Sequence, residues 1–149
     1  MKWLINISLL LIALTGFSQS DEKVIFNEGM EAYNKGNYTK ALERFEAAYA
    51  KNNKYNKALY NAANAAYRTG DFKKASDLYD MYAASLETKN ERAKAYHNLG
   101  NAHLKQKEYG EAVNAYKKSL RNNPNDKDTR YNLSYALSKL KKQQQQKKK

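Results

Sequence analysis

The chain repeats one pattern of small residues, aromatic residues and turn residues three times. The pattern is carried by AYNKGNYTKALERFEAAYA, AYRTGDFKKASDLYDMYAA and AHLKQKEYGEAVNAYKKSL. The small residues in the middle of these segments are Ala41, Ala75 and Ala112, which are 34 and 37 residues apart. A period of this length, with apolar residues three and four apart, is typical of stacked helical hairpins. Such stacks share one continuous core and expose extended surfaces that hold other molecules.

Each repeat is predicted to contain two helices joined by a short turn. The turns centre on Gly36, Gly70 and Lys107. Glycine adopts the left-handed backbone that ends a helix, and Asn37 and Asp71 can cap the helix that follows. A lysine at the glycine position should cost on the order of 1 kcal/mol in the third turn.

The first helices carry Gly29, Ala63 and Gly100 at one position, where close approach of two helices leaves no room for a large side chain. With the aromatic residues around these positions, the pattern resembles the tetratricopeptide repeat family. The resemblance implies an all-α fold, a right-handed superhelix of three helix-turn-helix repeats and a C-terminal capping helix. The expected organisation is repeats at 22–55, 56–92 and 93–126, a cap helix at 127–140 and a disordered Lys/Gln tail at 141–149.

The second repeat departs from the other two. Tyr82 stands where they have Ala48 and Ser119, and three extra residues follow it. We expect a longer second helix in this repeat, a local change in superhelix angle, and a Tyr82 side chain that is packed and does not face a ligand.

Residues 1–18 have the layout of a secretory signal peptide: Lys2, an apolar run from Trp3 to Leu14, then small and polar residues. Cleavage is expected after Ser18 or Ser20. The run is shorter than the roughly 20 apolar residues of a bilayer span, although an uncleaved anchor is the alternative. The chain has no cysteine, so neither disulfides nor thiolate chemistry are available. A periplasmic or secreted location follows from the signal.

The formal net charge is +12, and six lysines lie in the last eleven residues. A basic chain favours anionic partners such as acidic protein segments or phospholipid headgroups. Nucleic acid is a poor candidate for an exported protein. The lysine tail offers contact with a membrane surface, against the simpler alternative that it only keeps the chain soluble.

The first helix of each hairpin lines the concave face in this architecture, so residues at spacings of four and seven point into one groove. The groove combines aromatic, amide and cationic side chains, which suit an acidic or amphipathic peptide. Several of the tyrosines could instead pack between helices. The predicted groove residues are Phe26, Met30, Tyr33, Lys57, Tyr60, Asn64, Tyr67, Arg68, Lys94, His97, Asn101, Leu104, Lys105, Tyr131 and Tyr135.

Some members of the family bind a C-terminal carboxylate with two lysines, two asparagines and an arginine. Lys94 and Asn61 fall on two of these positions, whereas Phe26, Met30 and Asn98 occupy the others. The clamp is incomplete, so this activity is not assigned.

Nothing in the sequence predicts catalysis, a cofactor or a metal. His97 and His103 are six residues apart, which turns them about 240° around a helix and away from a common ligand. The sequence lacks a glycine-rich phosphate loop and a nucleophile elbow.

The NPND turn, the YNL start of the cap and the glutamine-rich tail also resemble exported repeat proteins of the bacterial Bat (aerotolerance) gene cluster. These are encoded beside membrane proteins with von Willebrand factor A domains and a MoxR-type ATPase. The resemblance implies a periplasmic adaptor for those membrane proteins, with a role in oxidative-stress tolerance.

Three hypotheses therefore remain open from the sequence. The first is an interaction scaffold that binds a partner segment in its concave groove. The second is a basic envelope-surface binder acting through the lysine-rich tail, and the third is a homo-oligomeric assembly factor.

Overall fold

The computed structural model describes residues 20–148, so the predicted signal segment lies outside the described residues. Seven helices account for nearly all of the described range. None of these helices is long and apolar enough to cross a membrane. The helices are α1 (Asp21–Asn34), α2 (Tyr38–Lys51), α3 (Asn56–Thr69), α4 (Phe72–Ala84), α5 (Lys89–Lys105), α6 (Tyr109–Asn122) and α7 (Lys127–Gln146).

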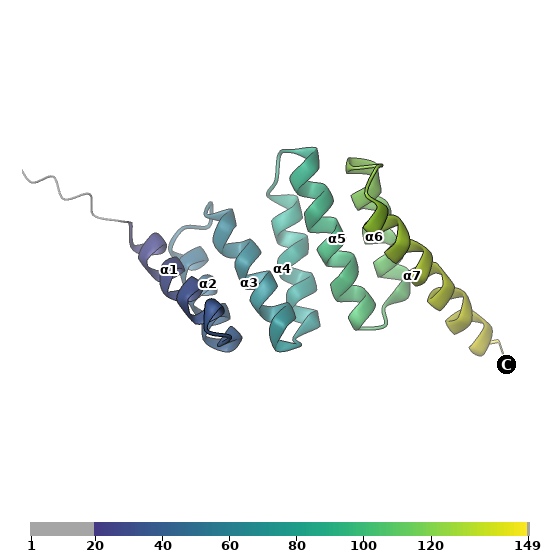
Figure 1. The fold of residues 1–149 in the computed structure, drawn as a ribbon, viewed down its shortest axis with the longest axis horizontal. Helices are drawn as coiled ribbons and strands as arrows, with labels where there is room; N and C mark the ends of the chain where they lie inside the picture. Colours follow the sequence, from purple (N-terminus) through teal and green to yellow (C-terminus); the bar gives the residue numbers. More distant parts are fainter. Residues whose placement is uncertain (1–19, 149) are drawn as a thin grey trace, which may run out of the picture.

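The helices stack in chain order, as Figure 1 shows. The hairpins α1–α2, α3–α4 and α5–α6 follow one another along the molecule, and α7 packs on α6 at the end. The core is built mostly of alanine around a few large rings: Phe26, Phe45, Tyr79 and Tyr116 are all at most 3% exposed. The predicted fold class, three helical hairpins and a capping helix, is confirmed.

The hairpin turns have the backbone that the sequence predicts. The φ angles of Gly36, Gly70 and Lys107 are 78°, 85° and 61°, so all three are left-handed. Asn37 caps α2 by accepting the backbone N–H of Lys40 at 3.1 Å. Asp71 accepts the backbone N–H of Lys74 in the same way, at 3.0 Å. Lys107 thus carries the strain of a conformation that glycine adopts freely.

In the first hairpin and in the third, the two helices cross at a glycine, as expected. A Cβ added to Gly29 would lie 2.7 Å from the Phe45 ring, and one added to Gly100 would lie 2.5 Å from the Tyr116 ring. Ala63 occupies the same position in the second hairpin, where it is fully buried beside Tyr79. The helices therefore approach closely at equivalent points of all three hairpins.

The prediction of a longer second helix in the second repeat is wrong. α4 has 13 residues, whereas α5 has 17 and contains the extra length as an additional N-terminal turn. This turn begins at an N-cap, in which the Thr88 hydroxyl accepts the Glu91 backbone N–H at 3.3 Å and donates to the Glu91 carboxylate at 2.5 Å. Tyr82 is half-buried, and its ring packs on Tyr60 with centroids 5.0 Å apart.

The predicted disordered tail needs correction as well. α7 continues to Gln146, well beyond the expected end of the cap helix at residue 140. Leu133, Ala136 and Leu140 anchor the helix on the third hairpin. Glutamine and lysine are good helix formers, so a helix already fixed by this packing extends through them at little cost.

Candidate functional site

The candidate binding surface runs across α3, α5 and α7. On α3, Lys57, Tyr60 and Asn64 lie at spacings of three and seven residues, and on α5 Lys94, His97 and Asn101 repeat the arrangement. These spacings place each set on one face of its helix.

Two buried tyrosines fix the orientation of the asparagine amides. The Tyr79 hydroxyl donates to Asn64 Oδ1 at 2.7 Å, and the Tyr116 hydroxyl donates to Asn101 Oδ1, also at 2.7 Å. Burial raises the pKa of both tyrosines, so each hydroxyl stays protonated and acts as a donor. Asn132 on α7 also donates to Asn101 Oδ1, at 3.1 Å. The Nδ2 groups of both asparagines are thereby left as hydrogen-bond donors for a ligand.

The cations of the groove differ in how they are held. Within residues 20–148, Lys57 and Lys94 are exposed and have no carboxylate within 4.0 Å. Lys57 Nζ lies 5.2 Å from the centroid of the Phe26 ring. Arg68, by contrast, stacks on Tyr38 with its guanidinium carbon 4.4 Å from the ring centroid and donates to the Tyr38 hydroxyl. Lys57 and Lys94 are thus available to an acidic ligand, whereas Arg68 is held against Tyr38.

Part of the predicted groove is core. Phe26 is only 3% exposed and packs against Phe45 and Tyr55, so its prediction as a groove residue is wrong. Met30 is half-buried and packs against the same core cluster.

Two predicted groove tyrosines take part in helix packing. Tyr33 contacts Tyr38 edge to face at 5.0 Å, and Tyr67 contacts Phe72 edge to face at 5.1 Å. In both hairpins this pair of rings packs beside the turn that joins the two helices. Leu104 fills the corresponding place in the third hairpin and packs on the last core cluster, while Lys105 beside it is exposed.

The capping helix completes the groove with two exposed tyrosines. Tyr131 is 74% exposed and Tyr135 is 45% exposed, one turn apart on α7. Lys139 Nζ lies 5.0 Å from the Tyr135 ring centroid. Large exposed aromatic rings beside a polar groove are typical of binding surfaces.

A pocket of about 210 Å³ lies between α3, α5 and the start of α7. It is lined by Tyr60, Lys94, His97, Asn98, Asp126 and Asp128. The Asn98 amide donates to the Tyr60 hydroxyl at 3.4 Å. Asp126 and Asp128 give this end of the groove negative charge beside Lys94, a contribution from the cap that the sequence analysis missed.

His97 is held by a network that ties α5 to α7. Its Nδ1 lies 2.6 Å from the hydroxyl of Thr129, a fully buried residue, and that hydroxyl donates to Asp126 at 2.7 Å. Because the hydroxyl proton goes to Asp126, the His97 Nδ1–H donates to Thr129. The Thr129 hydroxyl bond is the main cause that lowers the pKa of Asp126, and the nearby His97 adds to the effect. The sequence signal for the network was the Asp126–Thr129 spacing of a helix cap.

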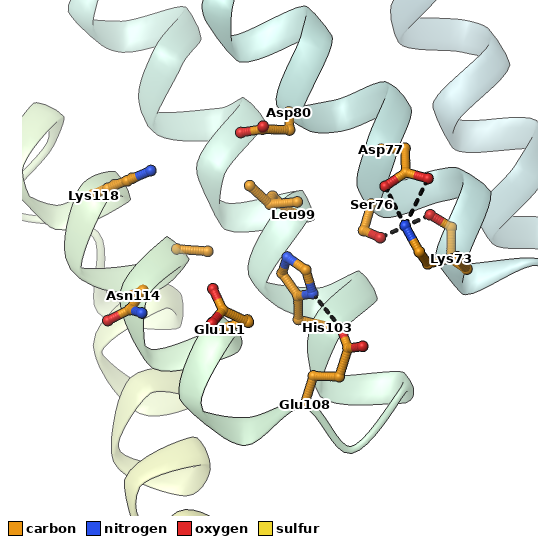
Figure 2. A pocket seen from close by; sticks show the side chains of 11 residues that line it. Lys73, Ser76, Asp77, Asp80, Leu99, His103, Glu108, Glu111, Asn114 and Lys118 are labelled. Atoms are coloured by element: carbon orange, nitrogen blue, oxygen red, sulfur yellow. Dashed lines mark hydrogen bonds and ion pairs between the residues drawn. The ribbon is translucent and has the colours of Figure 1, made fainter.

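A second pocket, of about 400 Å³, lies between α4, α5 and α6, on the other side of α5. Figure 2 shows its mixed charges, with Lys73 paired to Asp77 and His103 bonded to Glu108. Among the residues that the structure describes, no three His, Asp or Glu side chains are grouped as a metal site would require.

Stacked hairpins with an open polar face define a helical-repeat scaffold, and comparisons with known proteins give its family. Tetratricopeptide repeat models match residues 26–90, 93–126 and 115–148. The chain therefore belongs to the tetratricopeptide repeat family, whose repeats form non-catalytic scaffolds for protein–protein interaction.

Solved structures share the fold at low sequence identity. The first such domain of Spaghetti (RPAP3), bound to an HSP90 peptide, is 21% identical, with 80% of this chain and 92% of that chain covered and a TM-score of 0.70. The Sgt2 domain from Aspergillus fumigatus is 22% identical over 85% and 83%, with a TM-score of 0.70. The second domain of human RPAP3, bound to an HSP70 peptide, is 18% identical over 77% and 97%, with a TM-score of 0.67.

Proposed function

We propose that the protein captures an acidic segment of a partner protein in the groove formed by α3, α5 and α7. The observation that carries this proposal is the paired set of outward donors: the amides of Asn64 and Asn101, together with Lys57 and Lys94. Four donors on two neighbouring helices suit backbone carbonyls and side-chain carboxylates of one extended peptide. The exposed rings of Tyr131 and Tyr135 add apolar contact at one end.

Related folds support an acidic ligand. The first domain of Spaghetti is bound to the peptide SRMEEVD and the second domain of human RPAP3 to SGPTIEEVD. Here Asp126 and Asp128 lie near Lys94, and the buried Phe26 supplies no cation at the opposite end. We therefore propose that internal acidic residues of the partner, and not its terminal carboxylate, supply most of the recognition.

A pair of isosteric substitutions tests the groove without removing the buried contacts. In Asn64→Asp/Asn101→Asp, each carboxylate still accepts its tyrosine hydroxyl, but the outward donor becomes a negative acceptor. The control Asn114→Asp changes the charge of an exposed residue on α6, which lines the pocket on the other side of α5.

The assay selects displayed random dodecapeptides on immobilised protein and measures the enriched peptides by fluorescence anisotropy. We expect enrichment of acidic sequences that bind the control normally and the double variant at least about tenfold more weakly, as for the loss of one or two charge-assisted hydrogen bonds. Enriched peptides that bind the double variant as tightly as wild type would refute the groove.

We further propose that the protein is exported and that its partners include membrane proteins with von Willebrand factor A domains, as in a Bat-type oxidative-stress complex. The layout of residues 1–18 and the combination of the NPND turn with the glutamine-rich end support this. Mass spectrometry of the protein from the envelope fraction should find an N-terminus just after Ser18 or Ser20, and co-purification should recover those membrane proteins. An intact N-terminus in the cytoplasm would contradict export.

A further inference from the structure

A pocket of about 480 Å³ lies at the edge of the groove, where the second and third repeats meet. Three elements form it: the start of α3, the end of α4, and the first turn of α5. Its lining residues are Asn56, Lys57, Tyr60, Tyr82, Ser85, Leu86, Glu87, Thr88 and Glu91.

Two departures of this chain from its own repeat pattern create the pocket. Tyr82 replaces the small residue of the other repeats, and its ring lies 5.0 Å from that of Tyr60 at an interplanar angle of 39°. The additional turn of α5 then forms the opposite wall with Thr88 and Glu91. Figure 1 shows this turn and the α4–α5 connection standing at the upper end of the stack.

The walls of the pocket are held by hydrogen bonds within the chain. The Ser85 hydroxyl donates to the Tyr82 carbonyl at 2.8 Å, and the Arg92 guanidinium donates to the Glu87 carbonyl at 2.6 Å. The Thr88 N-cap and its bond to the Glu91 carboxylate fix the first turn of α5. A pocket with such a fixed rim binds a side chain without first having to order its own backbone.

We infer that this pocket takes an aromatic side chain of the segment that occupies the groove, an inference that rests on the proposed function. Tyr60 lines both this pocket and the one between α3, α5 and α7, so the two lie next to each other. The half-buried rings of Tyr60 and Tyr82, with Leu86 beside them, offer an apolar surface for an offset or edge-to-face ring contact. The partner's sequence should therefore place an aromatic residue near its acidic residues.

The pocket is lined by charges of both signs. Lys57 stands on one side, and Glu87 and Glu91 on the other. The Glu91 carboxylate accepts the Thr88 hydroxyl and keeps its negative charge, and Glu87 is exposed. The two tyrosine rings, and not the charges, therefore argue for an aromatic occupant, and a cationic side chain is the competing occupant that the test has to distinguish.

The test is an NMR titration of ¹⁵N-labelled protein with N-acetyl-phenylalanine amide, and with N-acetyl-arginine amide as the competing chemistry. The phenylalanine probe should shift the backbone amides of Tyr82, Leu86 and Thr88. In Tyr82→Ala the affinity should fall roughly tenfold, the size expected when one aromatic pair is lost. Ala48 occupies the same position of the first repeat, so this variant should keep the fold. The matched control is Met81→Ala, an exposed apolar side chain next to Tyr82 on α4 that lines neither this pocket nor the groove.

Larger shifts with the arginine probe at these amides, or equal phenylalanine binding by Tyr82→Ala, would overturn the inference. The double variant Asn64→Asp/Asn101→Asp distinguishes a failure of this inference from a failure of the proposed function. If the selected acidic peptides lose affinity for that variant but not for Tyr82→Ala, binding in the groove is supported and the aromatic pocket is refuted. If the phenylalanine probe binds as expected but the double variant binds the peptides as tightly as wild type, the proposed groove is refuted. The pocket is then a separate aromatic site that does not depend on the groove.

Discussion

The substitution Gly100→Ala tests whether the hairpins depend on backbone contact at their crossings. The new Cβ would lie 2.5, 2.6 and 2.9 Å from three atoms of the Tyr116 ring. Carbon atoms do not approach that closely, so either the ring or helix α5 must move. The ring has little freedom, because Tyr116 is fully buried and its hydroxyl is bonded to Asn101.

The expected magnitude combines two opposing effects. Overpacking a filled core costs about 1–3 kcal/mol. Alanine is favoured over glycine inside a helix by about 1 kcal/mol, which offsets part of that loss. Ala63 holds the equivalent position in the second hairpin, so the crossing tolerates a methyl group where its surroundings are adapted, and the fold should survive.

Gly110→Ala is the matched control, because a Cβ added there meets nothing within 4 Å and the residue is also helical. It carries a change in helix propensity of the same sign, in the first turn of α6, without the clash. Urea unfolding followed by circular dichroism at 222 nm should therefore show Gly100→Ala less stable than Gly110→Ala by about 1–3 kcal/mol, the overpacking cost alone. Equal stability of the two variants would refute the packing argument.

Three further predictions concern single side chains. Lys107→Gly should stabilise the protein by about 0.5–1 kcal/mol in the same urea assay, because glycine adopts the left-handed backbone without a Cβ clash. Thr88→Ala should cost about 1 kcal/mol and increase amide hydrogen exchange in the first turn of α5, because the N-cap hydrogen bond is lost. The folded pKa of Asp126 lies below its ordinary value of about 3.9, so its contribution to stability is present above that pH and is lost as the pH falls through the folded pKa. Asp126→Asn should therefore be less stable at pH 7 and should lose less stability than wild type between pH 5 and pH 2.

Each of these predictions has an outcome that contradicts it. If the urea concentration at the unfolding midpoint of Lys107→Gly were unchanged or lower than in wild type, the strain at this turn would be compensated elsewhere. Unchanged exchange in Thr88→Ala would mean that packing, and not the cap, holds the added turn. Parallel acid unfolding curves for wild type and Asp126→Asn would remove Asp126 from the acid response of the cap.

The features set by local chemistry were predictable from the sequence. The positive φ angles at Gly36, Gly70 and Lys107, the caps at Asn37 and Asp71, and the tight crossings at glycine all follow from single residues and their repeat positions. The pattern is redundant, since each feature recurs in several hairpins.

Features decided by competition between elements were not predictable in the same way. The extra residues of the second repeat lengthen α5 because the Thr88 side chain caps the start of this helix by accepting the Glu91 backbone N–H. The repeat pattern of the sequence had instead favoured a longer second helix in that repeat. Phe26 lies in the core because its ring packs between Phe45 and Tyr55, a contact that its repeat position does not indicate. The lengthening of α7 depends on tertiary anchoring upstream, which the polar composition of its end does not reveal.

The central claim, that a partner segment lies across α3, α5 and α7, is tested most directly by chemical-shift mapping. An acidic peptide from the selection should be titrated into ¹⁵N-labelled protein with side-chain amide detection. The account predicts the largest changes at the Nδ2 groups of Asn64 and Asn101 and along α3, α5 and α7. Changes concentrated on α2, α4 and α6, with both asparagine amides unmoved, would contradict it.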